Sequence, residues 1–128
     1  MPTAKIMYAD DNPDNLLAMR WILKGQDYIL LEAQNGRAAI ELALREHPDL
    51  ILMDIRMPVM NGLEATRQLK SMPETAETPI IMLTSSALAG DRQASFDAGC
   101  DAYMTKPIIR ADILTAIAAQ IQKRYWEA

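Results

Sequence analysis

The amino-acid sequence predicts an α/β fold in which helices cover both faces of a five-stranded parallel sheet. Short apolar runs alternate along the chain with longer segments whose apolar residues recur at helical spacing, and there are five of each. The short runs are almost continuously apolar, as strands are when both faces of a parallel sheet are buried. Right-handed crossovers leave few possible connections between such strands.

The N-terminal part of the chain predicts two strands and one helix. KIMYA at 5–9 and YILLEA at 28–33 are apolar runs of strand length. Between them, NPDNLLAMRWILKG at 12–25 predicts a helix that Gly25 ends. We expect the apolar face of this helix to contain Leu16, Met19, Trp21, Ile22 and Leu23.

The alternation continues to the C-terminus. The remaining strands, LILM, PIIML and AYM, are expected at 50–53, 79–83 and 102–104, and the remaining helices at 36–47, 63–72, 86–98 and 110–124. Pro48, Pro73 and Gly99 follow three of these helices and would end them. The last helix should present one apolar face through Ile113, Ile117 and Ile121.

Length and composition indicate one globular domain over residues 1–128, with 50% hydrophobic and 23% charged residues. A net charge of −4 gives no basic surface for nucleic acid or an anionic membrane. The apolar runs are too short to cross a membrane, and the start of the chain lacks the features of a signal peptide. The lone cysteine, Cys100, cannot form an internal disulfide. We therefore expect a cytoplasmic protein with no nucleic-acid or membrane partner.

Chemically active side chains are concentrated where the predicted strands end. In DLILMDIRMPVMNG, residues 49–62, Asp54 follows a buried run directly. The carboxyl ends of parallel strands meet at one edge of the sheet, where ligands bind. At that edge we expect Asp54 to be joined by Asp10, Asp11, Thr84 and Lys106. The sequence thus predicts three carboxylates, one hydroxyl and one ammonium group in a single crevice.

These groups suit a cation and a phosphoryl group. Two carboxylates at about 4 Å repel by roughly 4 kcal/mol at an effective dielectric of about 20, so either some of them are protonated or a cation joins them. Mg²⁺ prefers oxygen ligands and retains open positions for a phosphate. Asp54 could then act as a nucleophile and form an acyl phosphate, while Lys106 and Thr84 contact the phosphoryl oxygens.

The acidic pair Asp10-Asp11, the MDIRMPVMNG stretch around Asp54, Thr84 and the Lys106-Pro107 pair together resemble the signature of response regulator receiver domains. These domains are the phosphoacceptor modules of two-component signalling. The resemblance covers essentially the whole chain, and the combination of motifs is highly specific. It implies a flavodoxin-like, doubly wound (βα)5 fold with strand order 2-1-3-4-5.

The resemblance also implies a reaction and its participants. Asp54 would accept a phosphoryl group from the phosphohistidine of a histidine kinase or histidine phosphotransfer protein. Mg²⁺ would be held by Asp11, Asp54 and the backbone carbonyl of Arg56, with Asp10 acting largely through water. The protein would promote its own phosphorylation and dephosphorylation and would not be an enzyme in the usual sense.

A conformational switch follows from the same resemblance. Thr84 would turn toward the phosphoryl group, and Tyr103 would move from exposed to buried. This would remodel the face made by the fourth helix, fifth strand and fifth helix, through which a downstream protein target is bound. The Lys106–Pro107 bond would be cis.

We expect a free-standing module that is a monomer or a weak dimer.

Several positions depart from the common pattern or vary within it. Tyr8 is bulkier than the aliphatic residue usual in the first strand. Ser85 often corresponds to alanine or glycine, and a serine still leaves room for phosphate. Arg56 and Ser86 occupy positions that tune how water reaches the acyl phosphate.

Other interpretations remain open at this stage. Asp10 and Asp11 could merely cap the helix that begins near Pro13, and Tyr103 could be ordinary packing. A receiver domain cut from a hybrid histidine kinase would have the same sequence features. A phosphatase of the haloacid dehalogenase class needs a second aspartate where this chain has Arg56. A flavodoxin-type electron carrier or a phosphorylation-independent scaffold is disfavoured, the former by the acidic ADDNPDN loop, the latter because every reactive group is present.

Overall fold

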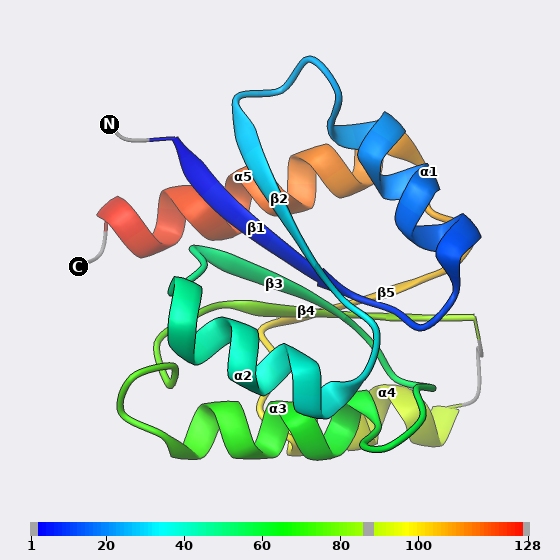
Figure 1. The fold of residues 1–128 in the computed structure, drawn as a ribbon, viewed down its shortest axis with the longest axis vertical. Coiled ribbons are helices and arrows are strands. Elements are labelled where there is room, and N and C mark those ends of the chain that lie inside the picture. Colours follow the sequence, from blue (N-terminus) through cyan, green and yellow to red (C-terminus); the bar gives the residue numbers. More distant parts are fainter. Residues whose placement is uncertain (1–2, 86–88, 127–128) are drawn as a thin grey trace.

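The computed structural model describes residues 3–85 and 89–126 and shows five parallel strands in one sheet within them (Figure 1). The strands are β1 (Ala4–Ala9), β2 (Tyr28–Ala33), β3 (Leu50–Asp54), β4 (Ile80–Thr84) and β5 (Ala102–Thr105). Their order across the sheet is β2-β1-β3-β4-β5, and every neighbouring pair is parallel. The predicted flavodoxin-like fold and its strand order are therefore confirmed.

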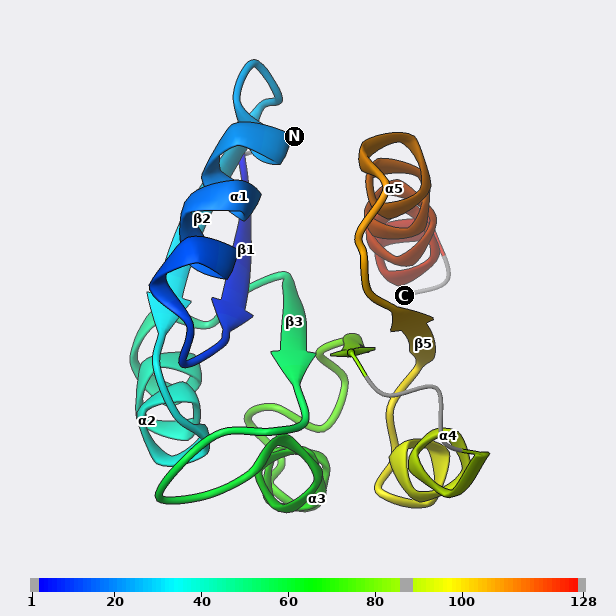
Figure 2. The same cartoon turned by 90° about the vertical axis from the view of Figure 1, so that its right-hand side faces the viewer.

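Helices cover both faces of this sheet (Figures 1 and 2). They are α1 (Pro13–Leu23), α2 (Gly36–Glu46), α3 (Gly62–Ser71), α4 (Ala89–Asp97) and α5 (Arg110–Trp126). Helices α1 and α5 lie on one face, and α2, α3 and α4 lie on the other. The start of the helix expected at 86–98 falls on 86–88, which lie outside the described residues.

The continuous apolar runs of the central strands arise because each strand contributes to two cores. Successive strand side chains point to opposite faces, so Tyr8 packs toward α1 and α5 while its neighbour Met7 packs toward α2 and α3. In β3 the same alternation sends Leu52 to the α1–α5 core and Met53 to the other. All four side chains are buried, which leaves no place for a polar residue until the strand ends.

The expected apolar face of α1 is wrong at Trp21, which is 63% exposed. The buried residues of this helix are Leu16, Met19 and Leu23. Trp21 follows Leu16 by five positions, which places it about 140° around the helix from that buried residue. It lies under the ammonium of Lys24, whose Nζ is 4.6 Å from the ring centroid.

Candidate functional site

The register of the sheet brings the ends of four strands to one edge. Ala9 pairs with Met53, Asp54 with Leu83, and Thr84 with Thr105. Asp10 therefore follows the end of β1, Asp54 and Thr84 are the last residues of β3 and β4, and Lys106 follows β5. The backbone N–H of Lys106 donates to the Thr84 carbonyl at 2.7 Å, which ties the last two of these strand ends together.

The loop after Asp54 is held close against the strand. The Gly62 N–H donates to the Ile55 carbonyl at 2.8 Å, and Asn61 caps α3 by accepting the Glu64 N–H. A Cβ atom at Gly62 would collide with the backbone carbonyl of Asp54. The Asn-Gly pair thus allows α3 to begin directly beside the aspartate, because only glycine leaves room for that carbonyl.

Three carboxylates meet at this edge. Asp10, Asp11 and Asp54 each offer an oxygen, and these oxygens lie within 4.8 Å of one another. Asp10 and Asp54 are buried, at 1% and 6% exposure, and Asp11 is exposed. This all-oxygen set, open to solvent on one side, fits a hard divalent cation such as Mg²⁺, which takes a few carboxylates and keeps water in its other positions.

Lys106 links two of the carboxylates across long sequence separations. Its Nζ donates to Asp10 Oδ2 at 2.8 Å and to Asp54 Oδ1 at 3.2 Å. The structure thus brings together Asp10, Asp11, Asp54 and Lys106 as the sequence predicts. Thr84 is fully buried at the end of the neighbouring strand. The Arg56 side chain is directed elsewhere, because its Nη2 pairs with Asp91 Oδ2 on α4 at 3.1 Å.

The two buried carboxylates differ in how well their charge is stabilised. Burial raises the pKa of Asp54. The Lys106 ammonium lowers this pKa in part, but burial together with the charge of Asp10 keeps it above its usual value. Burial also acts to raise the pKa of Asp10, yet hydrogen bonds from Lys106, Tyr8 and the Asn12 N–H leave that pKa below its usual value. The negative charge of Asp10 is therefore stabilised in this site, whereas the negative charge of Asp54 is disfavoured and would be stabilised by a further cation.

Sequence reasoning missed the contact between Tyr8 and Asp10. The Tyr8 hydroxyl donates to Asp10 Oδ2 at 2.6 Å, and burial raises the pKa of the phenol so that it remains a donor. Asn15 Nδ2 donates to the same oxygen at 3.1 Å, and the Asn12 N–H to Oδ1 at 2.9 Å. The signal was available, because residues two apart in a strand share one face. The residue that caps α1 is Asn12, so the capping interpretation of Asp10 and Asp11 is wrong.

The remaining predicted residues lie nearby or outside the described part of the chain. Tyr103 in β5 is half-buried against the core beneath α2 and α3, so it is not fully exposed in this structure. Burial raises its pKa, and the charge of Asp91 adds to the effect. The Lys106–Pro107 bond is cis. Ser86 lies outside the described residues.

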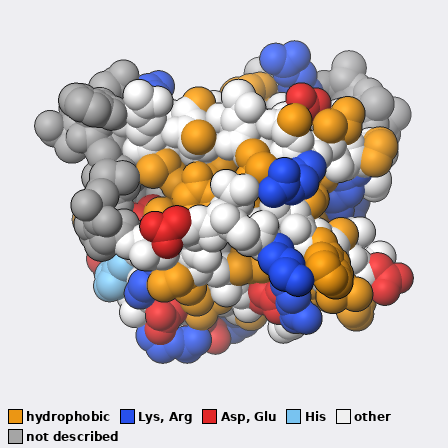
Figure 3. Space-filling view, turned by 90° about the horizontal axis from the view of Figure 1, so that it is seen from above, with side chains coloured by type: hydrophobic (Ala, Val, Ile, Leu, Met, Phe, Trp, Pro, Cys, Tyr) orange, Lys and Arg blue, Asp and Glu red, His pale blue; other side chains and the backbone are white. Residues whose placement is uncertain are grey.

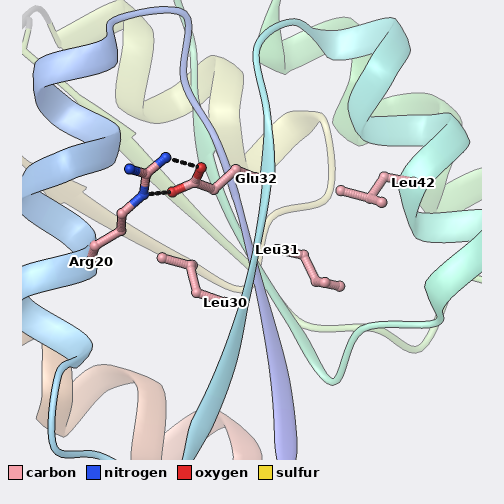
Figure 4. A pocket seen from close by; sticks show the side chains of 5 residues that line it. All are labelled: Arg20, Leu30, Leu31, Glu32 and Leu42. Carbon is pink, nitrogen blue, oxygen red and sulfur yellow. Dashed lines mark hydrogen bonds and ion pairs between the residues drawn. The ribbon is translucent and has the colours of Figure 1, made fainter.

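Two hollows on the described surface lie away from this edge. The larger, about 530 Å³, sits across β2 between α1 and α2 (Figure 4) and is lined by Arg20, Leu30, Leu31, Glu32 and Leu42. On the polar side of this hollow, the Arg20 guanidinium donates two hydrogen bonds of 2.6 Å to the Glu32 carboxylate.

Acidic, basic and apolar side chains are interspersed among the described residues visible in Figure 3. None of the described helices is long and apolar enough to cross a membrane.

Comparison with known proteins gives consistent matches. The sequence model of the response regulator receiver domain matches residues 6–118. Over 106 residues the chain is 39% identical to the polar-differentiation response regulator DivK of Brucella ovis, covering 83% of this chain and 86% of that protein. The receiver domain of a sensor histidine kinase from Pseudomonas aeruginosa, with a magnesium ion in its active-site cleft, has a TM-score of 0.86 at 35% identity over 92% of this chain and 97% of that one. A CheY-like receiver domain from Methanospirillum hungatei has a TM-score of 0.90 at 26% identity over 98% of both chains.

Proposed function

The chain belongs to the response regulator receiver domain family, the phosphoacceptor modules of two-component signalling, and on that premise we propose that Asp54 is the residue that accepts the phosphoryl group. The observation that carries the proposal is the placement of Asp54 at the tip of the central strand β3, 3.2 Å from the Lys106 ammonium and beside two further carboxylates. No other described carboxylate combines burial, a raised pKa and a place in that cluster.

The proposed reaction is an in-line transfer. A carboxylate oxygen of Asp54 attacks phosphorus in the phosphohistidine of a histidine kinase or histidine phosphotransfer protein. The new O–P bond forms as the N–P bond breaks, and the imidazole nitrogen keeps the electron pair and takes up a proton. Positioning and charge neutralisation supply most of the catalysis in such a transfer, and no further protein base is needed.

Mg²⁺ is the metal we propose for the acidic cluster, held by Asp11, Asp54 and the Arg56 backbone carbonyl, with Asp10 acting largely through water. When bound, the ion would neutralise the negative charge that otherwise repels a phosphoryl group. The oxygen donor set supports this assignment, as does the magnesium ion in the receiver domain from Pseudomonas aeruginosa. Lys106 would exchange its bonds to Asp10 and Asp54 for one to a phosphoryl oxygen, and Thr84 would donate to another.

Signal output is proposed to occur through the face formed by α4, β5 and α5. Thr84 and Tyr103 lie on β4 and β5, so movement of Thr84 toward the phosphoryl group would free space that the Tyr103 ring can enter. A downstream protein would read the rearranged face. We further propose that residues 1–128 form one receiver domain, monomeric or weakly dimeric, in a cytoplasmic setting that keeps Cys100 reduced.

The alternative of a haloacid-dehalogenase-type phosphatase is not favoured. Its mechanism requires a second aspartate two residues after the nucleophile, and the residue there is Arg56, whose guanidinium pairs with Asp91. A guanidinium cannot act as the general acid at neutral pH. The fold and the family match agree with a phosphoacceptor that takes part in signalling.

The experiment is phosphorylation by acetyl phosphate in the presence of Mg²⁺, followed by intact-mass spectrometry. We expect one phosphoryl adduct on the wild-type protein, none without Mg²⁺, and none on Asp54→Asn. The matched control is Asp97→Asn, which makes the same chemical change at an exposed position at the end of α4 and should retain the adduct. An adduct that persists on Asp54→Asn, or that is missing from the wild-type protein, would refute the assignment.

A further inference from the structure

Asp10 is surrounded by more hydrogen-bond donors than a carboxylate beside a metal site needs. Its Oδ2 accepts from the Tyr8 hydroxyl at 2.6 Å, from Lys106 Nζ at 2.8 Å and from Asn15 Nδ2 at 3.1 Å. Its Oδ1 accepts the Asn12 N–H at 2.9 Å. Three donors share one oxygen that has two lone pairs, so this oxygen remains hydrogen-bonded by two of them when the third leaves.

Lys106 is the donor that has to leave. In the proposed function its ammonium moves from the carboxylates to an oxygen of the incoming phosphoryl group. Asp10 is only 1% exposed, so apart from a water held by Mg²⁺ solvent cannot readily replace the lost bond, and the loss of a donor from a buried carboxylate is costly. Some other group must therefore remain on Asp10 for the transfer to be favourable.

We propose that the Tyr8 hydroxyl is a positioning group that keeps Asp10 satisfied while Lys106 transfers to the phosphoryl group. This inference rests on the proposed function and extends it to a residue that does not touch the reacting atoms. Tyr8 is well placed for the role because its ring is locked in the α1–α5 core, where it is 1% exposed. The hydroxyl is thus presented to Asp10 from a rigid strand and not from a mobile loop.

The Tyr8→Phe variant distinguishes the positioning role of the hydroxyl from a role of Tyr8 in packing alone. The variant keeps the ring in the core and removes only the hydroxyl. Before Lys106 moves, Asp10 Oδ2 still has two donors in the variant. After Lys106 moves, it has only Asn15. The loss should therefore be small for binding of Mg²⁺ alone and large for binding of a group that recruits Lys106.

The experiment measures two affinities by isothermal titration calorimetry. The first is for Mg²⁺ alone, and the second is for beryllofluoride, an analogue of the phosphoryl group, at saturating Mg²⁺. We expect Tyr8→Phe to change the first by less than about twofold and to weaken the second about tenfold, as the loss of one hydrogen bond to a charged group would. Asn15→Ala, which removes the other donor from the same oxygen at a half-buried position, should show the same split.

The matched control is Tyr28→Phe, the same chemical change at the opposite end of the sheet, beside the start of β1. It should alter neither affinity. If Tyr8→Phe and Asn15→Ala bind beryllofluoride as the wild-type protein does, or lose Mg²⁺ and beryllofluoride affinity equally, the proposal is overturned while the function stands. If the wild-type protein itself fails to bind beryllofluoride with Mg²⁺, the proposed function fails together with it.

Discussion

Replacing either buried carboxylate of the site should change the stability of the metal-free protein, and the two changes should have opposite signs. Asp54 lies within 4.8 Å of the other two carboxylates and 3.2 Å from Lys106. At an effective dielectric of about 20, the charge of Asp54 is repelled by each of the other two carboxylates by about 3.5 kcal/mol and is attracted to Lys106 by about 5 kcal/mol. Because Asp11 is exposed and screened, these contributions nearly cancel, which leaves the cost of burial.

We therefore expect Asp54→Asn to raise the free energy of unfolding by about 1–2 kcal/mol at pH 7 without Mg²⁺. Asp10→Asn should lower it by about 2–3 kcal/mol, because three side-chain donors and one N–H would lose their anionic acceptor. Urea denaturation followed by circular dichroism, in buffer with a chelator, measures both. The exposed Asp97→Asn control should stay within about 0.5 kcal/mol of the wild-type protein.

The pH dependence of the free energy of unfolding tests whether the pKa shifts of Asp54 and Asp10 cause these effects. The pKa of Asp54 is raised in the folded state, so its cost is present at neutral pH, decreases as pH falls through the folded value and is gone below the unfolded value of about 3.9. The advantage of Asp54→Asn should fade over that range. The pKa of Asp10 is lowered, so its contribution is present above about 3.9 and is lost as pH falls through the lower folded value. An Asp54→Asn protein that is less stable than wild type at pH 7 would refute this account of the site.

Three further perturbations follow from the same geometry. Lys106→Ala removes the ammonium shared by the carboxylates, and we expect it to lower the free energy of unfolding by about 2–3 kcal/mol in urea titrations and to abolish the acetyl phosphate adduct. Gly62→Ala forces a Cβ against the Asp54 carbonyl, so it should destabilise the protein by about 1–3 kcal/mol and slow phosphorylation; unchanged rates by mass spectrometry would contradict the tight loop. Arg56→Ala breaks an exposed ion pair with Asp91, so stability should change by less than about 1 kcal/mol while the hydrolysis rate of the acyl phosphate, followed by time-resolved intact mass, changes measurably.

The fold was predictable because one physical requirement recurs in every central strand. A parallel strand with two buried faces has to be apolar until it reaches the edge, and Leu52 and Met53 in β3 show this directly. The first polar residue after such a run is therefore at the edge where ligands bind. That rule places Asp54 and Asp10 correctly from sequence, and Lys106 comes one residue after Thr105, the first polar residue beyond the last run.

What could not be predicted depended on side-chain direction within an element. The helix segment around Trp21 is apolar on several sides, so periodicity does not say which residues face the sheet, and Trp21 was assigned to the wrong side. Tyr8 was recognised as bulky, but its hydrogen bond depends on the reach of a phenol along the strand to the residue two positions ahead. The spacing of two places both residues on one face of the strand, but it does not say whether the hydroxyl reaches the carboxylate.

The site stabilises the charge of Asp10 and disfavours the charge of Asp54, and this difference favours a chemical change at Asp54. Asp10 is held by donors from β1, from the start of α1 and from Lys106, and two of these four donors are the buried Tyr8 hydroxyl and the Asn12 backbone N–H. Asp54 is held by Lys106 at the longer distance of 3.2 Å, and burial disfavours its charge. Formation of the proposed acyl phosphate at Asp54 would remove that buried carboxylate charge and move the negative charge outward, to where Mg²⁺ and Lys106 could reach it. The affinity of the site for phosphoryl groups should then depend on how easily Asp10 releases Lys106, which is why the donors that remain on Asp10 matter as much as the nucleophile.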